Sequence, residues 1–206
     1  MNVFYLPDAR EGNVSFPEEE SKHIVRVLRM REGDTFCVTN GKGSLFDAEL
    51  IDAHPKRAMA NLLNRREGYD NRAFKLSIAI APTKLNERTE WFLEKATEIG
   101  IDEIKLFASY HSERRVVNVD RFKKIVVAAM KQSVKSNMPI VEEMQTFENL
   151  VRQDFSGQKF IAWIDEEVKD QLCNLYDKGS DVLVLIGPEG DFSKDEVELA
   201  KANGFV

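Results

Sequence analysis

The sequence predicts an α/β protein in two parts, a small β-barrel followed by a domain built on a mostly parallel sheet. Short strands separated by turn residues fill the first third of the chain, which is the pattern of small barrels. From Phe74 onward, strand patterns alternate with helical ones, as they do in βαβ units. The run Val182–Ile186 is continuously apolar, which is typical of a strand buried on both faces of a parallel sheet.

The first part should contain several short strands and one helix. Pro7 ends the first strand, acidic residues favour the first turn of the helix, and Gly41 and Gly43 suit the turn of a β-hairpin. The predicted elements are a strand at 2–6, a helix beginning at 16–18, hairpin strands at 35–40 and 44–52, and a strand at 58–66. Short strands with one helix indicate a barrel of the kind that often binds RNA.

The second part should begin after the polar, glycine-containing segment 67–71, which gives domains 1–70 and 73–206. Ser193 and Glu196 have the spacing of a capping box at the start of the last helix, and Gly204 suits the C′ position at its end. The predicted elements before that helix are strands at 75–81, 103–108, 159–164 and 182–186, and helices at 86–99, 119–136, 147–153 and 168–176.

The composition is that of an ordinary globular protein, with 43% hydrophobic and 31% charged residues among 206. No apolar run approaches the ~20 residues that span a bilayer, and the N-terminus has no signal-peptide pattern. We therefore expect a cytoplasmic location and no membrane partner. The two cysteines and three histidines are scattered along the chain, so no metal site is predicted.

The net charge of −6 is unevenly distributed along the chain. Residues 73–140 carry 12 basic and 8 acidic side chains, whereas residues 141–206 carry 6 basic and 15 acidic ones. A polyanion should therefore contact the first two-thirds of the chain. Arg26, Arg29 and Arg31 gather near the end of the first helix, where they either complement the helix dipole or contact RNA phosphates.

The segment Gly187-Pro188-Glu189-Gly190, here called the GPEG loop, follows the apolar strand at the edge where open α/β sheets bind ligands. Its glycines allow a ligand to approach the backbone, but it lacks the lysine and glycine spacing of a phosphate loop. Glu189 and Asp191 favour a cationic ligand over a phosphate-bearing one. The residues alone leave two interpretations open, a ligand-binding loop and a tight strand-to-helix turn.

Several segments occur together in an order that resembles one enzyme family. They are KLNERTEWFLEKATEIG at 84–100, Ser-Glu-Arg at 112–114, Lys-Gln-Ser at 131–133 and Ile-Gly-Pro-Glu-Gly at 186–190, preceded by HIVRVLR at 23–29, Gly-Asp at 33–34 and Asn-Gly-Lys-Gly at 40–43. The chain resembles the bacterial methyltransferases that modify N3 of a uridine in small-subunit (16S) ribosomal RNA. These are S-adenosylmethionine-dependent enzymes of the SPOUT superfamily, with a PUA-like barrel before a knotted α/β domain.

The sequence departs from the family pattern in a few places. Members usually have a glycine where Asp191 stands, and commonly an acid and an arginine where Lys131 and Lys135 stand. They normally continue past Gly204 with a strand and a helix that complete the trefoil knot and part of the cofactor pocket. We therefore expect a chain without the usual C-terminal tail, and a SPOUT domain that is incomplete at its C-terminus.

The resemblance implies roles for particular residues. The cofactor S-adenosylmethionine would be bound by Ile164, Asp165, Ile186, Gly187, Pro188, Glu189 and Gly190. Because N3 of uridine is protonated at neutral pH, a base or a nearby cation is needed, and Lys84 and Arg114 are the predicted catalytic residues. The predicted RNA contacts are Arg26, Arg29, Arg31, Lys42 and Arg115. Ordinary surface charge remains the alternative explanation for all these cations.

The resemblance also implies a homodimer that acts on small-subunit ribosomal RNA or on the assembled small subunit. Trp91 and Phe92, apolar residues in a charged helix, agree with a subunit interface. Two alternatives stay open. One is a SPOUT methyltransferase with a different RNA target, and the other is a non-catalytic RNA-binding protein.

Overall fold

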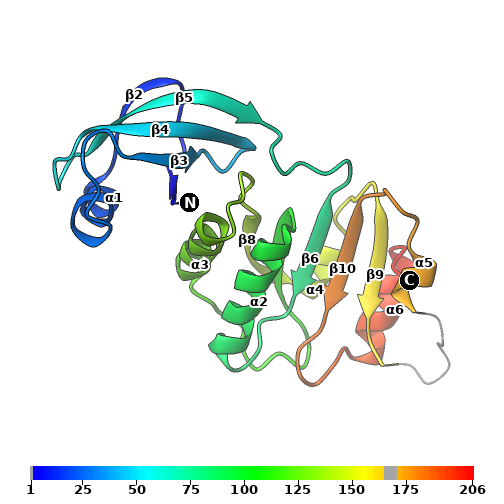
Figure 1. The fold of residues 1–206 in the computed structure, drawn as a ribbon. Coiled ribbons are helices and arrows are strands. Elements are labelled where there is room, and N and C mark those ends of the chain that lie inside the picture. The colour runs from blue at the N-terminus through cyan, green and yellow to red at the C-terminus, as the bar shows by residue number, and fades with distance from the viewer. Residues whose placement is uncertain (1, 165–170) are drawn as a thin grey trace. The chain divides into compact units, whose positions relative to one another are not determined.

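The computed structural model describes residues 2–164 and 171–206 (Figure 1). The chain forms two compact units. Unit 1 contains residues 1–71 and 127–138, and unit 2 contains residues 72–126 and 139–206. The predicted domain bounds, 1–70 and 73–206, remain a prediction. Residues 127–138, which those bounds assign to the second domain, cluster with unit 1.

Unit 1 is built on a five-stranded, barrel-type sheet with the order β1-β3-β4-β5-β2. The strands are β1 (Val3–Tyr5), β2 (Gly12–Ser15), β3 (Thr35–Thr39), β4 (Ser44–Asp52) and β5 (Met59–Glu67). The β1–β3 pair is parallel and the other pairs are antiparallel. The predicted hairpin is therefore confirmed as β3 and β4. Strand β2 was not predicted, because it is a short edge strand with one apolar side chain.

The helical segment of unit 1 begins at the predicted place and is irregular. α1 (Glu18–Lys22) continues directly into η1 (His23–Val27), a π-helical turn. Buried Ser21 fixes α1 to the sheet, since its hydroxyl donates to the Phe16 carbonyl (3.1 Å) and accepts from the Ala58 amide (2.9 Å). Arg29, two residues after η1, has a φ of 55°, a left-handed conformation that non-glycine residues seldom adopt.

Residues 127–138 are held to the barrel of unit 1 by hydrogen bonds around buried Ser136. The Ser136 carbonyl accepts from the Thr39 hydroxyl (3.2 Å) and from the Gly43 amide (3.0 Å), and its own amide donates to Asp70 (3.1 Å). The helix that supplies the first part of this segment, α3 (Val119–Gln132), ends four residues before the predicted position. Val134 has a φ of 58°, which breaks the helical geometry.

Unit 2 is built on a second five-stranded sheet, with the order β8-β7-β6-β10-β9. All its strand pairs are parallel, which confirms the predicted fold class. The strands are β6 (Leu76–Ile80), β7 (Glu103–Ala108), β8 (Ile140–Thr146), β9 (Gln158–Ala162) and β10 (Val182–Ile186). Strand β8 was not predicted, because polar residues interrupt it; as an edge strand it needs only one apolar face.

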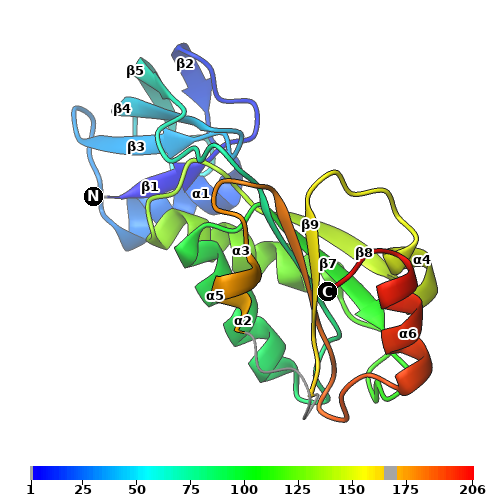
Figure 2. The same cartoon turned by 90° about the vertical axis from the view of Figure 1, so that its right-hand side faces the viewer.

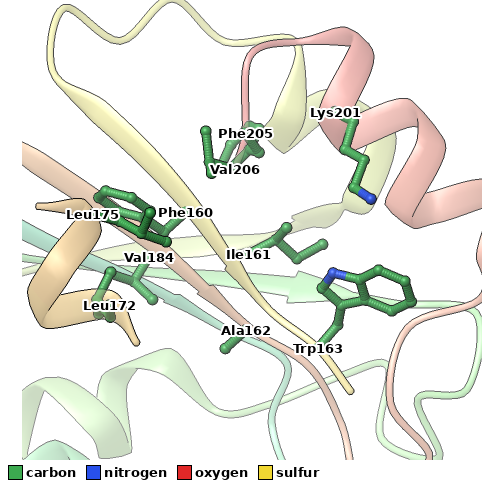
Figure 3. Close-up of a pocket in the computed structure, with 10 residues that line it drawn as sticks. All are labelled: Phe160, Ile161, Ala162, Trp163, Leu172, Leu175, Val184, Lys201, Phe205 and Val206. Atoms are coloured by element: carbon green, nitrogen blue, oxygen red, sulfur yellow. The ribbon is translucent and has the colours of Figure 1, made fainter. Parts of the chain in front are cut away.

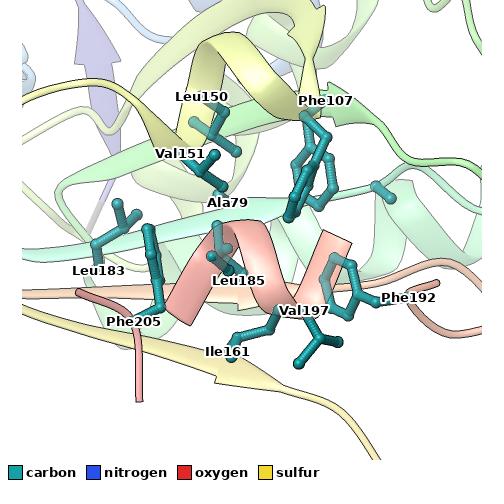
Figure 4. Close-up of a cluster of buried hydrophobic side chains, with 13 residues drawn as sticks. Ala79, Phe107, Leu150, Val151, Ile161, Leu183, Leu185, Phe192, Val197 and Phe205 are labelled. Carbon is teal, nitrogen blue, oxygen red and sulfur yellow. The ribbon is translucent and has the colours of Figure 1, made fainter. Parts of the chain in front are cut away.

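Helices cover both faces of this sheet. α2 (Asn86–Ile99) and α5 (Leu172–Leu175) lie on one face, and α4 (Phe147–Val151) and α6 (Lys194–Ala202) lie on the other (Figure 2). α5 is shorter than the predicted helix 168–176, part of which lies outside the described residues. Phe107 and Phe192 lie in the core of unit 2 (Figure 4), and both rings contact that of Phe147, the first residue of α4.

The last helix confirms the predicted capping box. The Ser193 hydroxyl accepts from the Glu196 amide, and the Glu196 carboxylate accepts from the Ser193 amide (2.9 Å). Gly204 has a φ of 83°, as expected of a C′ residue. No helix among the described residues is long and apolar enough to cross a membrane. The trefoil knot stays a prediction.

Candidate functional site

The carboxyl edge of the unit 2 sheet gathers several of the residues that the sequence singled out. In a parallel sheet the carboxyl ends of all strands meet at one edge. The segments that follow β6, β7, β9 and β10 therefore lie side by side. They carry Lys84, the Ser112-Glu113-Arg114 motif, Ile164 and the GPEG loop in turn.

The GPEG loop forms a tight turn closed by a hydrogen bond from the Asp191 amide to the Pro188 carbonyl (3.0 Å). A Cβ atom added to Gly187 would lie 3.0 Å from the Phe192 ring, and one added to Gly190 would lie 3.0 Å from the His111 Cβ. Both glycines therefore allow close packing against the protein itself. Neither has a positive φ; the left-handed residue is Asp191, which follows the loop and has a φ of 59°.

The segment after β6 is held by the GPEG loop on one side and by Arg114, after β7, on the other. The Lys84 amide donates to Glu189 (3.1 Å). The Arg114 guanidinium donates to the carbonyls of Thr83 (3.1 Å) and Lys84 (2.5 Å). Arg114 therefore uses two of its nitrogens to fix the backbone that carries Lys84.

A cavity of about 360 Å³ at this edge is lined by Lys84, Glu113, Arg114, Arg115 and Val116. Three of the predicted site residues, Lys84, Arg114 and Arg115, are thus brought together. The Lys84 ammonium lies 2.8 Å from the Glu113 carboxylate. The hydrogen bond to Glu113, and then the attraction of its charge, raises the pKa of Lys84 above the usual 10.5.

Buried Glu196 has a second role that the sequence did not reveal. Besides capping α6, its carboxylate accepts from the Tyr110 amide (2.8 Å) and the Ser109 hydroxyl (3.1 Å). The Ser112 hydroxyl accepts from the Ser109 amide (2.9 Å), so the serine of the Ser-Glu-Arg motif shapes the turn that presents Arg114. The capping pattern was a local signal for Glu196, but nothing local indicated a contact 86 residues away.

The remaining predicted cofactor residues lie at the same edge. Pro188 is buried, Ile186 and Gly187 are partly buried, and Glu189 and Gly190 are exposed. Ile164 follows the end of β9 and its amide donates to Asp191 (3.0 Å). Asp165 lies outside the described residues.

The predicted RNA contacts of unit 1 fall in two places. Arg26 lies in η1, with Arg29 and Arg31 just beyond it, and all three are exposed. Within the described residues, the side chains of Arg29 and Arg31 make no hydrogen bond or ion pair. Lys42 lies on the β3–β4 turn, and its ammonium donates to the Pro7 carbonyl (3.4 Å).

A separate hollow of about 500 Å³ lies beside β9, between α5 and the end of the chain (Figure 3). Its walls are mostly apolar. Lys201 also lines it, and the Lys201 ammonium lies 4.9 Å from the centre of the Trp163 ring. None of the predicted site residues lines it. Among the described residues, no group of three or more histidines, cysteines or acids could hold a metal ion.

Two known proteins are similar to the chain over most of their length. Ribosomal RNA small subunit methyltransferase E of Bacillus subtilis (strain 168) is 27% identical over 201 residues, which cover 89% of this chain and 77% of that protein. A probable rRNA-methyltransferase from Porphyromonas gingivalis has a solved structure with 40% identity and a TM-score of 0.90, covering 100% of this chain and 87% of that one.

The fold is also that of ribosomal RNA small subunit methyltransferase E from Neisseria gonorrhoeae bound to S-adenosyl methionine, at 24% identity and a TM-score of 0.87, covering 100% of this chain and 87% of that one. Two family descriptions match. Residues 16–63 match an RNA methyltransferase PUA domain, and residues 70–206 match an RNA methyltransferase domain. The chain therefore belongs to the RNA methyltransferase family, with a PUA domain ahead of the methyltransferase domain.

Proposed function

We propose that this protein transfers a methyl group from S-adenosylmethionine to N3 of a uridine in small-subunit ribosomal RNA. The observation that carries the proposal is the cavity that gathers Lys84, Arg114 and Arg115 beside the GPEG loop. Three positively charged side chains favour the binding of a nucleotide, because RNA is a polyanion. The name of the Bacillus subtilis relative supports small-subunit ribosomal RNA as the substrate class.

The GPEG loop fits S-adenosylmethionine by the chemistry of its residues. It exposes backbone at Gly190 and carries no lysine or arginine that would favour a phosphate. The carboxylates of Glu189 and Asp191 are compatible with a sulfonium cation. We infer that residues 186–190 and Ile164 hold the cofactor, with Asp165 as a further predicted contact. When bound, the cofactor supplies the electrophilic methyl group.

Lys84 acts as a cation in this proposal and does not accept the proton. Its raised pKa keeps the amine protonated at neutral pH, and a protonated amine cannot take a proton from N3. It can stabilise the negative charge that develops on the uracil as N3 loses its proton. Arg114 holds the Lys84 backbone in place, and Arg115 adds a second cation to the cavity.

Substitution of Lys84 tests this role. Lys84→Ala should lower kcat roughly 10²-fold to 10³-fold, because one stabilising group at the developing charge is lost. Lys84→Arg should retain part of the rate, since it keeps the positive charge. Methylation is measured by mass spectrometry of small-subunit ribosomal RNA, and Lys123→Ala, an exposed lysine outside the cavity, is the control.

A pH profile separates a cation from a base. Glu113→Gln removes the interaction that raises the pKa of Lys84, so loss of activity at alkaline pH should begin at a lower pH in this variant. In the unsubstituted enzyme, the hydrogen bond and charge of Glu113 raise the pKa of Lys84, so loss of the Lys84 charge should lower activity only at a more alkaline pH than in Glu113→Gln. Unchanged N3-methyluridine formation by Lys84→Ala would contradict the assignment.

The two alternative functions have distinct outcomes in cells. Small-subunit RNA from cells with and without the gene would differ by one N3-methyluridine if the proposal holds. A different modified nucleotide would indicate another RNA target, and no difference would favour a non-catalytic RNA-binding protein. We propose that the protein works in the cytoplasm, on this RNA or on the assembled small subunit.

We also propose a homodimer. The apolar side chains of Leu85, Trp91 and Ile99, at and along α2, are exposed in the single chain; Trp91 retains 63% of its surface. Burial of this surface against a second copy would remove apolar area from water. Sedimentation should give twice the chain mass, and a stable, active monomer would contradict the proposal.

A further inference from the structure

Asp191 is the junction of three segments at the carboxyl edge of the unit 2 sheet. One carboxylate oxygen accepts from the amide of Ile164, after β9 (3.0 Å), and the other accepts from the amide of its neighbour Phe192 (2.8 Å). Its main-chain oxygen lies 3.1 Å from the Nδ1 atom of His111, after β7. Asp191 itself follows β10. One residue thus connects segments that are 27 and 80 positions away in the sequence.

The backbone of Asp191 is held in a conformation that is costly for most side chains. Its φ is 59°, in the left-handed region where glycine has no Cβ clash. Aspartate tolerates this region because its short carboxylate can satisfy nearby backbone donors, and here it satisfies two. A residue that served only to make the turn would need no contact with Ile164.

The hydrogen bond from Ile164 to Asp191 fixes the backbone at Ile164, two residues after β9. β9 ends at Ala162, and the Ile164 side chain is 82% exposed, so packing does not hold this residue in place. Within the described residues, the Ile164 amide has Asp191 as its hydrogen-bond partner. A charge-assisted hydrogen bond of this kind is roughly twice as strong as a neutral one.

We propose that Asp191 is a positioning residue that holds the backbone at Ile164 beside the GPEG loop and so sets the shape of the cofactor site before the cofactor binds. This inference rests on the proposed function, because it concerns the same site. Asp191 acts on the backbone, since both carboxylate oxygens already accept amides. Preorganisation of this kind lowers the ordering cost of binding, so it affects affinity for S-adenosylmethionine more than the rate of methyl transfer.

Three substitutions of Asp191 separate its contributions. D191G removes both hydrogen bonds but relaxes the backbone, so the protein should stay folded. D191N keeps a residue that tolerates the left-handed conformation and retains one acceptor oxygen. D191A removes the acceptors and keeps the Cβ, so thermal unfolding should occur at a lower temperature than in D191G. D195N is the matched control, because Asp195 is exposed in the first turn of α6 and undergoes the same change of charge.

Two measurements on the full-length protein test the proposal. Hydrogen exchange, followed by NMR without ligand, should show the Ile164 amide exchanging at least tenfold faster in D191G and at an intermediate rate in D191N. Calorimetry should show about tenfold weaker binding of S-adenosylmethionine by D191G, while kcat at saturating cofactor stays within twofold. D195N should match the unsubstituted protein in both.

The outcomes distinguish this inference from the proposed function. Unchanged Ile164 exchange in D191G, or faster exchange with unchanged cofactor affinity, would overturn the role of Asp191 alone. A tenfold loss in kcat without a change in affinity would also overturn it, because it would place Asp191 in the chemical step. Failure of the unsubstituted protein to bind S-adenosylmethionine would overturn the proposed cofactor and this role together.

Discussion

Gly187 packs closely against Phe192, and it is also a proposed contact of the cofactor. A Cβ atom at this position would lie only 3.0 Å from the Phe192 ring, so close packing alone explains why the residue is glycine. The proposed cofactor contact is a second reason. The two explanations predict different cofactor binding in a variant with a smaller side chain at Phe192.

Gly187→Ala should leave the protein folded, with a free energy of unfolding about 1–3 kcal/mol lower from overpacking, and should abolish detectable S-adenosylmethionine binding by calorimetry. The double variant Gly187→Ala with Phe192→Leu relieves the crowding. Binding should stay lost in the double variant if the cofactor lies against the Gly187 backbone. Recovery of binding there would mean that glycine is needed only for Phe192.

The residues of the candidate site were predictable from the sequence to different degrees. Lys84, Arg114 and Arg115 could be named because all three fall in a basic segment, and because Lys84 and Arg114 belong to motifs that resemble a family. Asp191 was noted for its charge and as a departure from the family pattern, and its contact with Ile164 was not predicted. Such a hydrogen bond depends on which strand ends lie side by side in the sheet, and the local spacing of residues in the sequence does not predict that.

Among the helices and strands, those with a strong hydrophobic pattern in the sequence were predicted correctly. α2 was predicted to the residue, and β10 by its unbroken apolar run. The edge strands β2 and β8 were missed, because a strand with one exposed side needs few apolar residues. α3 was predicted too long, since nothing in its helical pattern revealed the left-handed Val134.

The N-terminus of α6 provides a test at this scale. Ser193→Ala removes one cap and should lower the free energy of unfolding by about 1 kcal/mol. Glu196→Ala should lower it by about 2–3 kcal/mol, because the amide of Tyr110 and the hydroxyl of Ser109 also lose their acceptor. Urea unfolding measures both. Equal losses would show that the contact with the segment after β7 contributes nothing.

For the whole molecule, the uneven distribution of charge predicts which part of the chain binds RNA. The acidic last third should repel RNA, while exposed Arg29 and Arg31 in unit 1 have no ion pair among the described residues to compete with a phosphate. RNA contact by these arginines stays a prediction, and because they lie far from the GPEG loop in sequence, it can be tested by mutation separately from cofactor binding.

Arg29→Ala and Arg31→Ala together should weaken RNA binding and make the slope of log K against log salt shallower by about 1 to 2, because each arginine that neutralises a phosphate contributes about 1 to that slope. Alanine keeps a Cβ at Arg29, so the left-handed backbone is not perturbed further. Filter binding over a series of salt concentrations gives the slope, and calorimetry should show unchanged S-adenosylmethionine affinity. Arg152→Ala, in the acidic third, is the control; an unchanged slope in the double variant would remove this segment from the RNA surface.

The strand order β8-β7-β6-β10-β9 has a consequence for how the protein is made. β10 lies between β6 and β9, so both strands lack a partner on that side until residues 182–186 have been synthesised. At ribosomal rates of about 5–20 residues per second, β6 waits roughly 5–20 seconds for β10. During that interval the nascent chain presents an open parallel edge, and this edge is where we expect chaperones to engage it and where premature termination would leave an aggregation-prone fragment.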